Sequence, residues 1–204
     1  MPPPLFNLKS KNQMNNCANI SKNLVLSQCA AGVAAVEPEL ILINFDDIDR
    51  DECEVSGNVI SEIVLASSKK GYKYTSAKNA METDSPLVKG TYRNAFDHKV
   101  VARVFDKTQD IKDELIKLKE GKVIAIVKNV DKRNDETRYE VYGWENGLEM
   151  ADLQAASTDT DGVIYNITLQ SGDNAKESQL PMSLYATSLS ATETMIAGLI
   201  ATSS

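Results

Sequence analysis

Short apolar segments of strand length recur along most of the chain and restrict the fold classes open to it. Residues 39–45 (ELILINF) form a near-continuous apolar run, which is typical of a strand buried on both faces. Residues 122–130 (KVIAIVKNV) form a second run, rich in the β-branched side chains that favour strands. By the same criteria we expect further strands at residues 58–65, 71–75, 87–92, 99–105, 138–144, 148–155 and 163–169.

One pair of these segments is separated by a strong turn signal. Glu145-Asn146-Gly147 lies between residues 138–144 and residues 148–155. Asn and Gly tolerate the positive φ that tight turns between antiparallel strands require. The sequence therefore predicts that the two segments pair as a β-hairpin.

The clearest helical pattern covers residues 107–119. Asp106 precedes this stretch at a capping position, and Gly121 follows it as a natural C-terminal cap. Acidic residues are concentrated in the first turns and lysines in the last, which complements the helix dipole. A second, weaker helix is expected at residues 191–200. The apolar stripe of the first helix consists of Ile111, Leu115 and Leu118.

About eight short strands and one packed helix predict a mainly β domain of the α+β class. We expect a β-sandwich or a partly closed barrel over residues 37–177, flanked by the helix at about residues 107–119. A doubly wound α/β fold is excluded, because it would need helices alternating with the strands.

Residues 1–36 differ from the rest of the chain in charge. All 29 acidic residues lie beyond residue 36, where 19 basic residues accompany them, so that part carries −10 and the first 36 residues carry +3. This segment is either a frayed terminus or an extended N-terminal arm that docks on the acidic body of a neighbouring subunit. The candidate contact residues of the arm are Lys9, Lys11, Lys22, Leu24 and Leu26.

Residues 178–204 form an apolar C-terminal segment rich in Ser and Thr. Glu193 is its only charged residue, and leucine, isoleucine and methionine recur along it. So much apolar surface with so little charge is unfavourable in water. We expect this segment to pack either on its own sheet or on a neighbouring subunit.

Two acidic turns contain carboxylates spaced as in some metal sites. Residues 47–51 (DIDRD) resemble the start of a calcium loop, but Glu52 stands where that loop needs Gly and Asn58 stands where it needs Glu. Residues 159–162 (DTDG) have the composition of an ordinary turn. We therefore expect solvated turns and no metal ion at either place.

The residues that could support catalysis are few. His98 is the single histidine and follows Asp97, a pairing that could act as a general base. No nucleophile is placed beside it by sequence, so we expect a polar residue at a strand end. Trp144 is expected to pack against the core rather than to bind a ligand. The glycines match no phosphate-binding loop. The chain is accordingly predicted to have no enzymatic activity and no cofactor.

Charge, cysteine content and the apolar runs indicate which binding partners and which cellular compartment to expect. A net charge of −7 argues against a protein that binds nucleic acid through phosphate contacts. Cys17, Cys29 and Cys53 cannot all pair within one chain and are expected to be reduced thiols. The first residues lack the apolar stretch of a signal peptide, and the apolar runs are too short to span a bilayer. We expect no secretion signal and no membrane anchor.

Four segments, in order, carry a resemblance to a known class of proteins: residues 40–49 (LILINFDDID), 96–106 (FDHKVVARVFD), 142–148 (YGWENGL) and 167–181 (ITLQSGDNAKESQLP). They resemble small virion structural proteins of tailed bacteriophages, with the strongest similarity to tail-tube-like or tail-hub proteins of crAss-like and related phages of Bacteroidetes-type hosts. The resemblance extends over about residues 37–181.

This resemblance implies a tail-tube-like β-sandwich with a flanking helix. It implies a homo-oligomer, a hexameric or dodecameric ring in the virion tail, assembled in the cytoplasm of the host bacterium. Other tail or portal-side structural proteins would be partners, and genomic DNA would only pass through the channel. The family's stacking element is a long hairpin or loop, for which residues 66–89 are the best match. The alternative from another class is a non-viral β-sandwich module for binding or as an adaptor.

Overall fold

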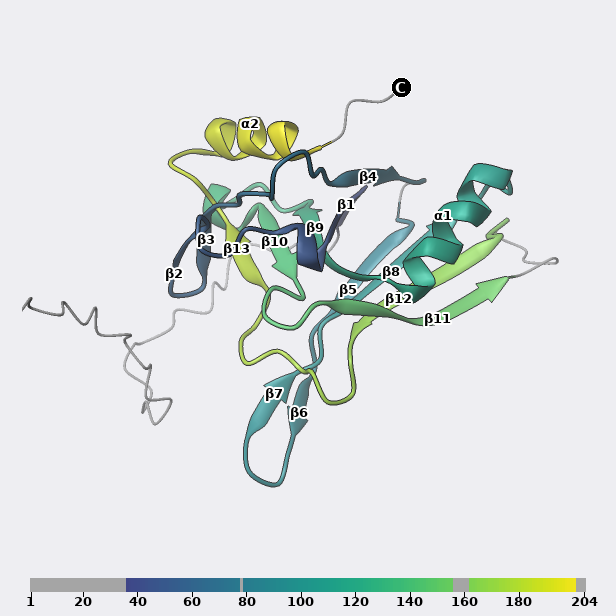
Figure 1. Cartoon of the computed structure of the whole chain (residues 1–204), viewed down its shortest axis with the longest axis horizontal. Coiled ribbons are helices and arrows are strands. Elements are labelled where there is room, and N and C mark those ends of the chain that lie inside the picture. The colour runs from purple at the N-terminus through teal and green to yellow at the C-terminus, as the bar shows by residue number, and fades with distance from the viewer. Residues whose placement is uncertain (1–35, 78, 156–161, 201–204) are drawn as a thin grey trace, which may run out of the picture. The chain divides into compact units, whose positions relative to one another are not determined.

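A computed structural model describes residues 36–77, 79–155 and 162–200, and the structural statements below refer to these residues. The described chain is mainly β, and its strands form one large mixed sheet with helices packed on it (Figure 1). The predicted α+β class is thereby confirmed. The sheet is not closed into a barrel. Its path of paired strands ends at two edges, so the architecture is an open sheet.

Two strands at the centre of the sheet carry the core. β1 (Val36–Asn44) pairs antiparallel with β9 (Lys122–Asn129), and Ile41 lies opposite Ile126. Successive residues of both strands alternate between two separate apolar clusters. Because neighbouring side chains of a strand point to opposite faces, the two clusters cover the two faces of the sheet. The buried strand predicted at residues 39–45 is thus β1, which ends at Asn44, one residue earlier than expected.

The other strands extend the sheet on both sides of this centre. The β3–β13 pair is parallel and the remaining pairs are antiparallel, which makes the sheet mixed. Two 3₁₀ turns, Phe45–Asp47 and Asp135–Thr137, follow β1 and precede β10. In spatial order the strands are β2 (Glu54–Ser56), β3 (Val59–Glu62), β13 (Met182–Leu184), β10 (Tyr139–Tyr142), β9, β11 (Leu148–Ala155), β12 (Tyr165–Ser171), β8 (Lys99–Val104) and β5 (Met81–Asp84), with β4 (Tyr72–Thr75) paired to β1.

The helix predicted at residues 107–119 is α1 (Gln109–Glu120). Its apolar stripe is buried at Leu115 and Leu118, in the same cluster as Leu40 and Leu42 of β1. The N-terminal cap is Thr108, whose hydroxyl accepts a hydrogen bond from the Ile111 N–H at 3.3 Å. The expected cap, Asp106, instead accepts from the next backbone N–H. Gly121 caps the C-terminus with φ −91°, so the left-handed conformation open to glycine is not used.

The C-terminal segment contains β13 and the second helix, α2 (Leu189–Leu199), which starts two residues earlier than expected. Ile196 and Leu199 of α2 are buried in the cluster that contains Ile41 and Ile43. The two helices therefore lie on opposite faces of the sheet (Figure 1). The described part of the segment lies on its own sheet.

The hairpin predicted around Asn146-Gly147 does not form. β10 and β11 do not pair with each other, and both pair with the edge of β9 that faces away from β1. Tyr142 lies opposite Ala125 and Leu148 opposite Val123, so residues 143–147 loop out of one nearly continuous edge. Gly143 and Gly147 both have positive φ, and the Gly147 N–H donates to the Gly143 carbonyl at 2.9 Å. Asn146-Gly147 does lie in a turn, but the turn belongs to a loop that joins two strands paired with the same edge of β9.

A separate two-stranded hairpin consists of β6 (Leu87–Lys89) and β7 (Asn94–Phe96), with its turn at residues 90–93. It projects from the large sheet (Figure 1). The strand expected at residues 87–92 therefore ends at Lys89. In the segment matched to a stacking loop, residues 66–89, β4 and β5 belong to the large sheet and pair with β1 and β8.

Candidate functional site: a buried polar centre at the base of the hairpin

The β6–β7 hairpin is attached to the body through Glu177. The backbones of Phe96 and Glu177 exchange two hydrogen bonds of 2.7 and 3.0 Å. The Glu177 carboxylate is buried and accepts the backbone N–H groups of Glu145 and Asn146, both at 2.9 Å. Burial raises the pKa of Glu177, and the two N–H donors partly oppose that shift. Glu177 thus joins the hairpin base, through its backbone, to the loop at residues 143–147, through its carboxylate.

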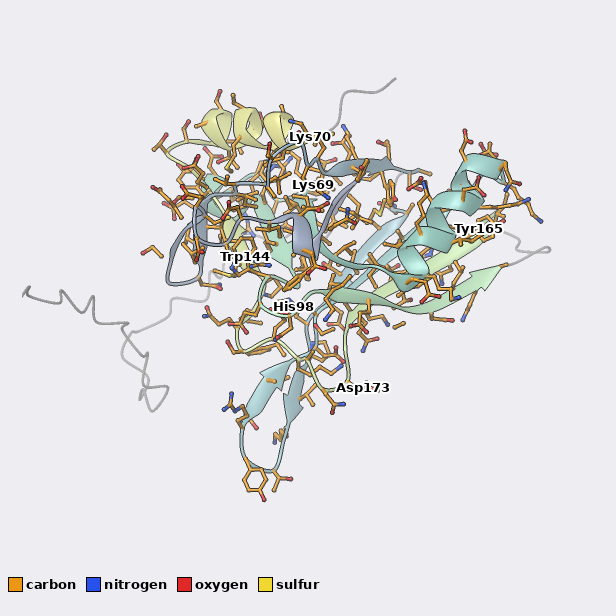
Figure 2. All side chains as sticks on the ribbon, viewed as in Figure 1. Lys69, Lys70, His98, Trp144, Tyr165 and Asp173 are labelled. Atoms are coloured by element: carbon orange, nitrogen blue, oxygen red, sulfur yellow. The ribbon has the colours of Figure 1, made fainter. Side chains whose placement is uncertain are left out.

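His98 makes a second link to the same loop. Its Nδ1 accepts the Gly143 N–H at 3.1 Å, so its Nε2–H must donate to the Gln179 carbonyl at 3.0 Å. The ring is buried, and this burial lowers the pKa of His98 to about 4. His98 is therefore neutral near pH 7, and backbone groups occupy both of its ring nitrogens. Figure 2 labels both His98 and Trp144, with His98 between the large sheet and the hairpin and Trp144 at the level of the sheet.

Asp97 and His98 do not act as a pair. The Asp97 carboxylate accepts from Lys176 Nζ at 2.8 Å and from the Gln170 side-chain amide at 2.6 Å. Lys176 Nζ also donates to the Ser171 carbonyl at 2.9 Å. Because Asp97 is bound to these groups, it does not orient the imidazole. The geometry of a general base with an orienting carboxylate is not formed here.

Arg50 lies between two aromatic rings at the edge of this centre. Its guanidinium carbon is 4.7 Å from the centroid of Phe45 and 4.1 Å from that of Trp144. Such stacking stabilises a cation against an aromatic face. Desolvation lowers the pKa of Arg50, and the nearby Cys53 and Glu177 oppose that shift. Trp144 is buried in the apolar cluster that also contains Ile196 and Leu199 of α2, which agrees with its expected packing role.

The acidic turn at residues 47–51 forms an ion pair. Asp47 accepts from Asn44 Nδ2 at 2.8 Å and pairs with Lys69 Nζ at 2.8 Å. The hydrogen bonds from Lys69 and then from Asn44 lower the pKa of Asp47. Among the described residues, no group of three or more His, Cys, Asp or Glu is placed to hold a metal ion. Residues 159–161 of the second acidic turn lie outside the described part.

Several residues singled out in the sequence lie outside the described part of the chain. Cys17 and Cys29 belong to this group, and the third cysteine, Cys53, is a free thiol whose pKa is raised by burial. The other members are the candidate contact residues of the arm, Lys9, Lys11, Lys22, Leu24 and Leu26.

Exposed apolar side chains mark a different kind of site on the hairpin. Leu87 is 52% exposed on β6, Val88 next to it is also exposed, and Tyr92 in the turn is 99% exposed. Lys89 and Arg93 flank them, and the stretch from residue 85 to residue 96 contains no acidic residue. The hairpin therefore presents an apolar and basic surface beyond the acidic body.

No protein-family model, curated protein or solved structure matches this chain. The resemblance to phage tail proteins therefore stays a prediction from the residues that carry it. Within the described residues, no helix combines the length and the apolar character needed to cross a membrane.

Proposed function

We propose that the chain is a non-enzymatic structural protein of a phage tail, whose copies bind one another in a ring around the DNA channel. The mainly β composition and the helix α1 packed on the sheet agree with the mainly β domain and flanking helix that the resemblance implies. The polar centre also supports a structural role, because the hydrogen bonds of His98 and Glu177 join the hairpin to the body. This proposal covers both a long tail tube and a single hub or adaptor ring.

The β6–β7 hairpin is the observation that carries the proposal. Its strands pair with each other, and Leu87, Val88 and Tyr92 leave apolar surface in water. Exposed apolar groups that cluster on a projecting element are typical of contacts between proteins. Burying them against another copy would remove that unfavourable exposure. In the proposed assembly the hairpin takes the contact role that residues 66–89 were expected to play.

The free edges of the sheet are a second support. β2 ends the sheet on one side and β5 ends it on the other, and neither has a second partner among the described strands. Unpaired edges are ready surfaces for pairing with another chain. A ring needs two different complementary patches on each subunit, joined head to tail. An open sheet with a projecting hairpin supplies several such surfaces.

The charge of the chain is compatible with DNA that passes without binding. The full sequence carries −7, and an acidic channel wall would repel phosphate groups. Other tail or portal-side proteins would then be the neighbours of the ring, which would be found in the virion tail after assembly in the host cytoplasm.

The test compares the full-length chain with two charge-introducing variants by native mass spectrometry and negative-stain imaging. Tyr92→Asp combined with Leu87→Asp places charge on the hairpin, and Ile116→Asp places charge on an α1 side chain that is 64% exposed. We expect closed multimers for the wild type and the Ile116 variant and smaller species for the hairpin variant. A single-copy wild type at high concentration would refute the proposal. If that monomer gained thermal stability with a peptide or metabolite, the alternative binding module would be favoured.

A further inference from the structure

The short strand β2 lies at the edge of the sheet with one side free, and apolar side chains are exposed there. It pairs with β3 on one side and has no second partner among the described residues. Val55 of β2 is 45% exposed and Val59 of β3 is 37% exposed. Backbone groups and apolar side chains are thus available together for an added strand.

The surroundings of this edge are acidic. Asp51, Glu52, Glu54 and Glu62 are all exposed around β2 and β3. Within the described part of the chain none of the four forms an ion pair, and Glu54 accepts only a weak hydrogen bond from Ser61 at 3.3 Å. The nearby cation, Arg50, is held between Phe45 and Trp144. The edge therefore suits an extended segment with basic and apolar side chains.

The chain contains such a segment outside the described residues. Residues 1–35 have no acidic residue, and Lys22, Leu24 and Leu26 follow one another at every second position. In an extended strand these three side chains lie on one face. That face would place one cation near the acids and the leucines near Val55, whereas Val59 points to the other face of the β2–β3 pair. The charge of the segment therefore agrees with the free edge.

We propose that residues 22–26 of one copy add as a strand to the free edge of β2 in a neighbouring copy. This inference rests on the proposed function, because it specifies one contact within the assembly. Residues 27–35 connect the segment to β1, and nine extended residues span at most about 32 Å. That length is the upper limit on how far the segment can lie from β1 of its own copy.

Zero-length cross-linking of the full-length chain tests the contact directly. Unlabelled and ¹⁵N-labelled chains are mixed in equal amounts at low concentration, concentrated, treated with a carbodiimide and digested for mass spectrometry. We expect Lys22 to be linked to Glu52 or Glu54, with mixed-isotope pairs that arise only between copies. Links that join Lys22 only to acids away from this edge, or that occur only within one isotope, would overturn the inference.

A charge exchange provides a second readout. Lys22→Glu and Glu54→Lys should each raise the concentration needed for assembly about 1.5- to fivefold, the effect of one exposed ion pair. The double variant should return it to the wild-type value. The control is Glu120→Lys, which makes the same charge change at the exposed end of α1. If the two single variants and the double variant all form rings at the wild-type concentration, the contact is refuted and the proposed function stands. A monomeric wild type would refute both.

Discussion

The buried imidazole of His98 predicts a specific loss of stability in mild acid. Protonation of Nδ1 would bring a new N–H against the Gly143 N–H that this atom now accepts. Burial lowers the pKa of His98 from 6.5 to about 4, so the unfolded chain binds the proton more tightly than the folded one. The stability that His98 contributes is therefore complete above about pH 6.5. It is lost progressively as the pH falls toward 4.

The size of this loss follows from the two pKa values. A shift from 6.5 to about 4 corresponds to a maximum of about 3.4 kcal/mol, at 1.36 kcal/mol per pH unit. At pH 5 most unfolded chains carry the proton and few folded chains do. His98 alone is then expected to lower the free energy of unfolding by about 2 kcal/mol between pH 7.5 and pH 5.

Glu177 acts in the opposite direction and must be separated from His98. Burial raises its folded-state pKa, so the folded chain holds this proton more tightly than the unfolded chain. Its contribution to stability therefore grows as the pH falls from above the raised folded pKa toward 4.5. In the wild type the two effects partly cancel. The Glu177→Gln variant, which cannot ionise at this position, should lose more stability between pH 7.5 and pH 5 than the wild type.

Urea unfolding at pH 7.5 and pH 5 measures both effects at one fixed protein concentration, because assembly also stabilises the folded state. His98→Gln keeps a donor for the Gln179 carbonyl and removes the titration. Compared between the two pH values, this variant should lose about 2 kcal/mol less than the wild type. An equal loss in the variant and the wild type would refute the role given to His98.

Two further changes test how local structure is fixed. Thr108→Ala removes the α1 cap and should cost about 1 kcal/mol, whereas Asp106→Ala should leave the free energy of unfolding nearly unchanged; equal effects in thermal melts would contradict the cap assignment. Gly143→Ala places a Cβ 2.7 Å from Leu148 Cγ at φ +73° and should lower the free energy of unfolding by more than about 1 kcal/mol. Gly162→Ala is the control that isolates the contact, because Gly162 has a similar φ of +76° but lies in open space. Equal losses in the two glycine variants would mean that the conformation alone is responsible.

The elements predicted best from the sequence are those whose pattern is local. β1 and β9 were found because their apolar runs reflect burial on two faces, and α1 because Leu115 and Leu118 repeat at helical spacing. β2 and β13 were missed, since three residues are too few to show a period. Thr108 was missed as the cap because Asp106 carries a similar local signal two residues earlier.

The pairing of strands and the polar centre depend on contacts that no local pattern records. Asn146-Gly147 predicts a turn, but β10 is already paired on both edges, with β9 and β13, so it cannot also pair with β11. The Glu177 carboxylate reaches backbone groups 31 and 32 residues earlier in the chain. The sequence places Arg50 in an acidic turn, and its position between Phe45 and Trp144 follows only from the fold.

The mass of the native assembly tests the central claim most directly. The full-length chain is concentrated, weighed by native mass spectrometry and imaged by negative-stain microscopy. We expect closed rings of six or twelve copies of the 22.3 kDa chain. A single copy at every concentration would contradict it.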